Sequence, residues 1–160
     1  MSSTSEEPFP WSDRALSDVI ASVRIMNVFA GFTRDFAPII QRLEDLNQRT
    51  TILVPANGSI MSLPRKPWES TKDYKTYGEQ AFEGAEGRER ARANLQSFVQ
   101  AHILPFSPWK EGVKLKTLAE KEVWWQLKDE DRFVQPANAE VLDVIRAGNG
   151  EIWLLSGVLV

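Results

Sequence analysis

The sequence predicts an α+β domain, because apolar residues recur at helical spacing in its first half and at strand spacing in its second half. Its 160 residues are 42% hydrophobic, which is enough chain for one well-packed core. We therefore expect a single domain over residues 15–160. Residues 1–14 are rich in Ser, Glu and Pro, and we expect them to form a flexible tail.

Four segments have the i, i+3, i+4 spacing of amphipathic helices, at residues 16–23, 36–46, 57–63 and 89–103. Ser12 or Asp13 would cap the first, and Asn57 would cap the third. Pro38 lies near the start of the second, where a helix tolerates proline. Residues 64–90 are a long polar insertion with spaced aromatic residues, and we expect it to pack over the core.

Short runs with a period of two predict strands. The first, at residues 50–54, is aliphatic and β-branched, and Pro55 ends it without needing a ladder donor. The others follow one another in the second half, at residues 113–118, 123–127, 132–135, 140–145 and 151–155. Alternation in the last of these predicts a half-buried strand with Ile152 and Leu154 on one face. Trp124 and Trp125 are adjacent, so one is expected in the core and the other to face outward.

The composition excludes several classes of function. The formal charge of −3 does not favour binding to nucleic acid. The chain has no cysteine and one histidine, which excludes disulfides, thiol catalysis and Cys/His metal sites, and we expect no cofactor. No apolar run approaches the roughly 20 residues of a membrane helix, so we expect no membrane span in this chain.

The single histidine is the one candidate for a catalytic base. Ser97 and Ser107 are the serines nearest to His102 in sequence, and neither lies in a Gly-x-Ser-x-Gly elbow. A lone histidine on the apolar face of a helix is typical of a hydrogen-bonded structural residue. We therefore expect His102 to be structural.

Three polar motifs have simple interpretations. Residues 129–131 are acidic but lack the spacing of a calcium loop, and they are expected to form a solvated turn. Arg90 is four residues after Glu86 and is expected to pair with it on an exposed helical face. Asn57-Gly58-Ser59 is a glycosylation acceptor triplet, although a capping role for Asn57 would leave it poorly accessible.

Several segments resemble the signatures of the fasciclin domain family. Residues 51–63 resemble the first signature, a strand followed by proline, a small residue, asparagine and a short helix. Residues 149–159 resemble the closing Asn-Gly and alternating strand. Residues 95–105 and 116–118 resemble the central helix with its histidine and the Lys-Thr-Leu that opens the strand meander. The motif residues expected to be structural are Thr51, Pro55, Asn57, Leu63, His102, Asn149 and Gly150.

The resemblance implies a compact β-sandwich of about seven strands with helices packed along one edge. It also implies a non-enzymatic adhesion or interaction domain with a protein or glycan partner. The loops at residues 64–69 and 107–110 are similar to those of single-domain fungal fasciclin proteins, which are secretory or vacuolar. The expected location is thus the vacuole lumen, the cell surface or the medium. The chain would then be an excised domain without its signal peptide, which leaves open a membrane association of the full-length protein.

The sequence departs from the family pattern in two places. Ala101 precedes the histidine where the family has tyrosine. Val144 and Ile145 stand where integrin-binding members have an Asp-Ile pair, so integrin-type binding is not expected. The candidate interaction surface comprises Trp68, Trp109, Asp143 and Ile145.

Two alternatives remain open at this point. One is a small-ligand binder or hydrolase-type enzyme that uses a cleft near His102. The other is a structural spacer without a specific partner.

Overall fold

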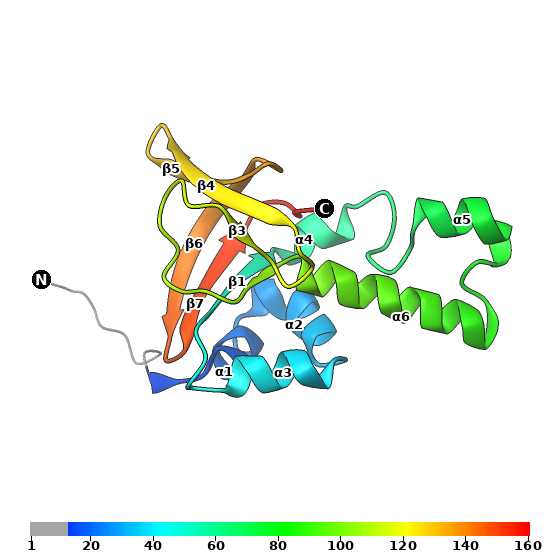
Figure 1. The fold of residues 1–160 in the computed structure, drawn as a ribbon, viewed down its shortest axis with the longest axis horizontal. Coiled ribbons are helices and arrows are strands. Elements are labelled where there is room, and N and C mark those ends of the chain that lie inside the picture. The colour runs from blue at the N-terminus through cyan, green and yellow to red at the C-terminus, as the bar shows by residue number, and fades with distance from the viewer. Residues whose placement is uncertain (1–12) are drawn as a thin grey trace, which may run out of the picture.

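The computed structural model describes residues 13–160, and the tail predicted for residues 1–14 lies outside this range except for its last two residues. The helical elements, in chain order, are α1 (Leu16–Ala21), η2 (Arg24–Met26), α2 (Asn27–Thr33), α3 (Ala37–Glu44), α4 (Asn57–Met61), α5 (Thr71–Tyr77), η3 (Gly78–Gln80) and α6 (Gly84–Gln100). The strands are β1 (Thr50–Pro55), β2 (Ile103–Leu104), β3 (Leu115–Lys116), β4 (Glu122–Lys128), β5 (Asp131–Gln135), β6 (Ala139–Ala147) and β7 (Gly150–Leu155). The predicted α+β class is confirmed (Figure 1).

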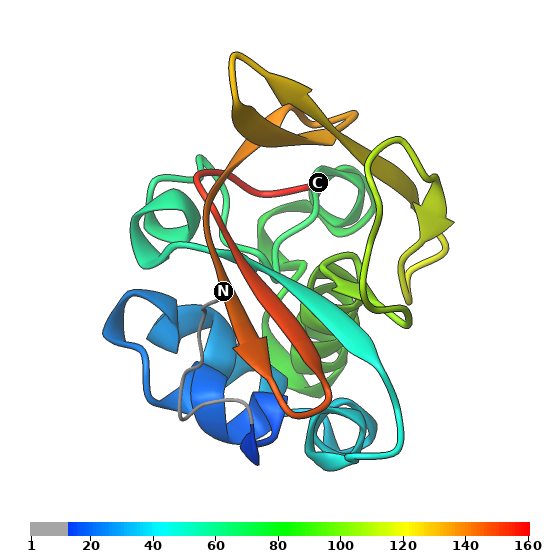
Figure 2. The same cartoon turned by 90° about the vertical axis from the view of Figure 1, so that its left-hand side faces the viewer.

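The seven strands form one sheet in the order β2-β1-β7-β6-β5-β4-β3. The neighbouring strands β1 and β7 are parallel, and the other pairs are antiparallel. Leu118, just after β3, donates its backbone N–H to the carbonyl of Ile103 in β2 at 2.9 Å, which links the two edges of the sheet. The expected number of strands is correct, but two packed sheets are not present: the strands wind into a single, nearly closed sheet (Figure 2).

Two hydrophobic cores lie on opposite faces of β1 and β7. The helix-side core includes Ile52 and Ile152 and packs them against α1, α2, α3 and α6. The sheet core lies inside the curved sheet and includes Leu53 and Trp153. Because β1 is buried along its whole length and β7 after its second residue, the central strands are inaccessible from either side.

This double burial corrects the prediction that residues 151–155 form a half-buried strand. Ile152 and Leu154 do share one face, as predicted, and both belong to the helix-side core. The opposite face, which was expected to be solvated, carries Trp153 and Leu155, each 0% exposed. A parallel strand that is covered on both faces typically has an uninterrupted run of apolar residues, and residues 152–155 form such a run.

The predicted helices are present with shifted ends. The first two correspond to α1 and α3, and Pro38 lies in the first turn of α3. The N-cap residue of α1 is Ala15, and that of α4 is Ala56, so the capping roles expected for Asp13 and Asn57 are not realised. Ser12, the other residue expected to cap α1, lies outside the described residues. The helix expected at 89–103 is α6, which begins five residues earlier and stops before β2.

Residues 64–90 contain α5, η3 and the first turns of α6, and with the rest of α6 they form an arm that projects from the sheet (Figure 1). No residue of α5 is buried. The arm is held together by its own contacts: Asn94 of α6 donates to the carbonyl of Trp68 and to the carboxylate of Asp73, each at 3.0 Å, and Tyr74 stacks edge-on against Phe82. The insertion thus packs against α6 instead of covering the core.

None of the helices within residues 13–160 combines the length and the apolar character that crossing a membrane requires.

Candidate functional site

His102 lies just after α6 and is fully buried between α6, α2 and the C-terminal segment. Its ring is 4.7 Å from the ring of Phe98 and 5.6 Å from that of Phe29, measured between centroids. Nδ1 lies 2.7 Å from the carbonyl oxygen of Phe98, and Nε2 accepts the backbone N–H of Leu159 at 3.0 Å. A backbone amide can only donate, so Nε2 must carry the lone pair and Nδ1 the hydrogen.

This environment fixes the protonation state of the histidine. Burial lowers the pKa of His102 from 6.5 to about 4, and the hydrogen bond to the Phe98 carbonyl opposes this shift only in part. The ring is therefore neutral near neutral pH, with both nitrogens engaged. A general base needs a lone pair that can reach a substrate, and this one is already occupied by Leu159.

Asn149 fastens the turn between β6 and β7 to the helices. Its side chain is fully buried; Oδ1 accepts the N–H of Leu16 at 2.8 Å, and Nδ2 donates to the carbonyls of Leu43 and Asp45. Gly150 follows it against β1, where an added Cβ would lie 1.7 Å from the carbonyl oxygen of Thr50. The Asn-Gly pair thus serves as a buried anchor followed by a close backbone contact, more than as a simple turn.

Asn57 makes a similar connection at the start of α4. Its Oδ1 accepts the N–H of Val28 in the first turn of α2 at 3.0 Å, and Nδ2 donates to the carbonyl of Arg24 and to Oδ1 of Asn27. The side chain therefore caps a helix about thirty residues earlier in the chain instead of its own. A glycan on Nδ2 would replace one of its two hydrogens, so at least one of these donor contacts would be lost in a glycosylated domain.

The remaining motif residues also make interior contacts. The hydroxyl of Thr51 donates to the carbonyl of Phe106, and Pro55 is the last, buried residue of β1. Leu63 packs partly buried against the helix-side core. The motif residues therefore hold elements together, and none of them lines an open site with a free polar group.

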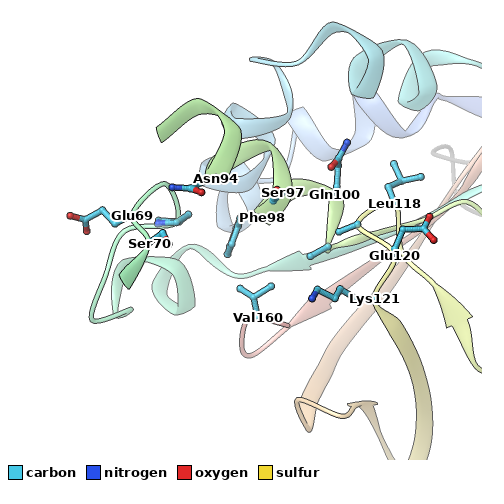
Figure 3. A pocket seen from close by; sticks show the side chains of 13 residues that line it. Glu69, Ser70, Asn94, Ser97, Phe98, Gln100, Leu118, Glu120, Lys121 and Val160 are labelled. Carbon is cyan, nitrogen blue, oxygen red and sulfur yellow. The ribbon is translucent and has the colours of Figure 1, made fainter. Parts of the chain in front are cut away.

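A hollow lies beside the C-terminal half of α6, and we call it the α6 groove (Figure 3). It has a volume of about 630 Å³, with walls from residues 67–70, α6, the turn at 118–121 and Val160. Phe98 and Leu118 contribute apolar surface, whereas Ser97 and Lys121 contribute polar groups. His102 is not among the lining residues, so the cleft expected near it exists but does not expose the imidazole.

A second hollow of about 270 Å³ lies between Phe36 and the middle of α6, and Trp68 forms part of its wall. Arg92 also lines this hollow, and its guanidinium lies 4.8 Å from the centroid of the Phe36 ring. Residues 67–70 therefore separate the two hollows: Pro67 and Ser70 line the α6 groove, whereas the intervening Trp68 lines the second hollow.

The comparisons with known proteins agree with this geometry. A FAS1 domain-containing protein of Aspergillus fumigatus is 47% identical over 146 residues, which cover 90% of this chain and 62% of that protein. Another, from Neurospora crassa, is 47% identical over 145 residues and covers 89% of this chain and 64% of that protein. The chain is a fasciclin-like domain. It spans less than two thirds of the length of these relatives. No protein-family model matches it.

A solved structure of a FAS1 domain pair from fasciclin I, an insect cell adhesion molecule, has the same fold. It superposes with a TM-score of 0.59 at 14% identity, covering 92% of this chain and 51% of that one. At this identity the likeness establishes the fold of the fasciclin-like domain and nothing about its partner.

The four predicted surface residues do not form one surface on this domain. Trp109 is 3% exposed and stacks on Trp153 in the sheet core with ring centroids 5.1 Å apart, so its assignment to a surface is wrong. Ile145 packs partly buried against the helix-side core, and Asp143 is exposed beside a bulge in β6. Trp68 is partly exposed, and the loop between α4 and α5 that carries it lies on the other side of the domain from β6 (Figure 1).

Sequence reasoning missed how the arm uses its arginines. Arg90 does not pair with Glu86: its Nε donates to the carbonyl of Ala81, and its guanidinium lies 3.8 Å from the centroid of the Tyr77 ring. The arginines at 88, 90 and 92 alternate with Glu89 and Ala91, and Tyr77 lies thirteen residues before Arg90, so no local pattern indicated this stacking contact. The acidic residues 129–131 form the tip of the β4–β5 hairpin, and within residues 13–160 no cluster of His, Asp and Glu could hold a metal ion.

Proposed function

We propose that this fasciclin-like domain is a non-enzymatic interaction domain that contacts a protein or glycan partner in the vacuole lumen or at the cell surface. The observation that supports it best is Trp68, a partly exposed indole on residues 67–70, the segment that separates the two hollows on α6. Partly exposed tryptophan beside a concave surface is typical of the residues that dominate binding energy at interfaces. The fungal relatives share the domain, and the insect structure belongs to a cell adhesion molecule.

The segment that carries Trp68 is ordered before any partner binds. Its carbonyl is held by Asn94, and the carboxylate of Glu69 accepts the N–H of Lys66 at 2.7 Å and the hydroxyl of Tyr74. These hydrogen bonds lower the pKa of Glu69 below its usual value, so the carboxylate stays ionised and continues to accept from both donors. A preorganised segment loses little conformational entropy on binding, which favours affinity.

The enzymatic alternative has less support. A hydrolase would need His102 as its acid or base, and this side chain is 0% exposed with both nitrogens engaged. A small-ligand binder needs only a concave surface, and the α6 groove falls within the size range of ligand pockets. A ligand in this groove would raise the melting temperature, whereas a protein partner that contacts Trp68 would depend on the indole.

The decisive experiment compares two tryptophan variants. Trp68→Ala removes the indole from the arm, and Trp124→Ala removes another partly exposed indole on β4, which lies in the sheet and outside the arm. We expect a partner isolated by crosslinking to wild type to bind Trp68→Ala at least about ten-fold more weakly, a loss of about 1.4 kcal/mol. Binding to Trp124→Ala should be unchanged.

If Trp68→Ala and Trp124→Ala bind the partner with equal affinity, the assignment of the binding surface to the arm is wrong. Failure of wild type to crosslink to any partner above background would support a structural spacer instead. The compartment is tested separately, by imaging a fluorescent fusion of the full-length protein. Cytosolic fluorescence would refute the vacuolar or cell-surface location without touching the binding result.

A further inference from the structure

The C-terminal segment, residues 156–160, is tied to the domain at two points. At its start, the N–H of Ser156 donates to the carbonyl of Glu140, and the carbonyl of Ser156 accepts the hydroxyl of Ser59. Three residues later, the N–H of Leu159 donates to Nε2 of His102. Val158 and Leu159 also make partly buried contacts with the two cores, and Val160 is 70% exposed.

The second tie depends on an atom that can change from acceptor to donor. Neutral His102 accepts the Leu159 N–H at Nε2. A proton taken from water would occupy the Nε2 lone pair, so the two N–H groups of His102 and Leu159 would face each other without an acceptor. The Nδ1–H bond to the Phe98 carbonyl would survive this change, because it already donates. Protonation therefore breaks the contact with the C-terminal segment selectively and leaves the contact with α6 in place.

No charged side chain in the elements packed around His102 would compensate a positive imidazolium. The sequences of α2, of β1, of the last turn of α6 and of residues 156–160 contain no Asp, Glu, Lys or Arg. The ring can gain solvation only by reaching the α6 groove, which lies beyond Phe98 and Ala101 and carries the charges of Glu69, Glu120 and Lys121. Release of the segment opens that route, because Val160 forms one wall of the groove.

We propose that residues 158–160 form a latch on the α6 groove, held by neutral His102 and released when His102 is protonated. In the closed state the segment lies against His102 and Val160 narrows the groove (Figure 3). In the open state the groove widens and gains the edge of a cationic ring. The latch rests on the proposed function only in so far as the groove is part of the binding surface, since its release is a property of the fold alone.

The pH range follows from the two environments of the ring. Burial holds the pKa of His102 at about 4 in the closed state, whereas a released and hydrated imidazole titrates near its ordinary 6.5. Opening and protonation are coupled, so the midpoint of release lies between these values. Release therefore accompanies acidification well below neutral pH.

The test is backbone NMR of the whole chain between about pH 7 and pH 4. We expect the heteronuclear NOE of Leu159 and Val160 to fall from values of ordered backbone to values of mobile backbone, while the amide of Trp153 in β7 keeps its chemical shift. A segment that stays ordered until β7 itself unfolds would overturn the proposal. Because no partner is present in this measurement, its failure is distinguishable from failure of the proposed function.

Two variants separate the histidine from general acid effects. His102→Gln keeps a side-chain oxygen that accepts from Leu159 and does not titrate, so the segment should stay ordered down to about pH 4. Leu159→Pro removes the N–H donor, so the segment should be frayed already at neutral pH. An unchanged pH profile in His102→Gln, or an ordered end in Leu159→Pro at pH 7, would refute the latch. If His102→Gln does not fold, the Leu159→Pro result decides.

Discussion

Replacing Asn149 by alanine should lower the free energy of unfolding by about 3–5 kcal/mol, although the change removes only an amide group. Two of its three hydrogen-bond partners, the N–H of Leu16 and the carbonyl of Leu43, are buried, and each would lose its partner. An unsatisfied buried backbone group costs about 1–3 kcal/mol. The third partner, the carbonyl of Asp45, is only partly buried, so water can replace much of that bond.

The assay is urea unfolding followed by tryptophan fluorescence, because Trp153 is buried and reports on the centre of the sheet. The expected result is a lower midpoint with an unchanged slope, as for a two-state loss of stability. Asn47→Ala is the matched control, since Asn47 is exposed and should change stability by no more than about 0.5 kcal/mol. A loss below about 1 kcal/mol for Asn149→Ala would refute the reasoning, because it would mean that solvent reaches the partners.

A second substitution at the same position tests the direction of the hydrogen bonds. Asn149→Asp keeps an acceptor for Leu16 but turns a carboxylate oxygen toward the carbonyls of Leu43 and Asp45. Burial raises the pKa of such a carboxyl, and the protonated form regains one donor. The variant should thus be less stable than Asn149→Ala at neutral pH and recover as the pH falls, a trend opposite to that of the other variants.

Three further predictions concern single side chains. Gly150→Ala should prevent folding or cost more than about 4 kcal/mol, because its Cβ would meet the Thr50 carbonyl, whereas Gly157→Ala has open space and should be neutral by thermal melting. His102→Gln should flatten the pH dependence of stability: wild type in the closed state loses up to about 3 kcal/mol as the pH falls from 6.5 to 4, because the unfolded histidine binds a proton that the buried one excludes, and release of residues 158–160 reduces this loss. A slope equal to that of wild type in chemical denaturation would contradict this. Trp109→Ala should cost about 3–5 kcal/mol as a buried indole, and a loss near zero would show that Trp109 is a surface residue after all.

The strands of the second half were predictable because their signals are local. β4, β5, β6 and β7 each begin and end within about two residues of the predicted bounds, since alternation and turn residues lie within the same few positions. The turn between β4 and β5 has positive φ at Asp129 and Glu130, which matches its expected solvated hairpin tip. Such features need no knowledge of the rest of the chain.

The elements that were missed depend on distant partners. The sequence of α2 contains Gly31 and β-branched residues, so its own helix propensity is weak, and its first turn is capped by Asn57 from thirty residues further along. β2 has two residues and exists because it pairs with β1, about fifty residues earlier. α6 starts before the predicted position because Gly87 accommodates the backbone of Phe82, which no local pattern reveals.

The candidate site was harder to predict than the fold for the same reason. Trp68 and Trp109 both lie in polar segments with proline and are equivalent as patterns. Only the closure of the sheet puts one indole inside and leaves the other on the arm. Exposure is a property of the assembled domain, so a surface cannot be chosen from aromatic residues alone.

The contacts of the motif residues explain why recognising the family says little about the partner. Asn57, His102 and Asn149 each join segments that are between about thirty and more than a hundred residues apart; His102 and Asn149 do so in the interior, and Asn57 does so in a partly buried position. Their polar atoms already form hydrogen bonds within the domain, so a partner cannot bind them directly. The exposed residues of the projecting arm and of the groove beside it make none of these contacts. The residues that determine specificity are therefore expected on the arm and in the groove, which the motif residues hold in place but do not form.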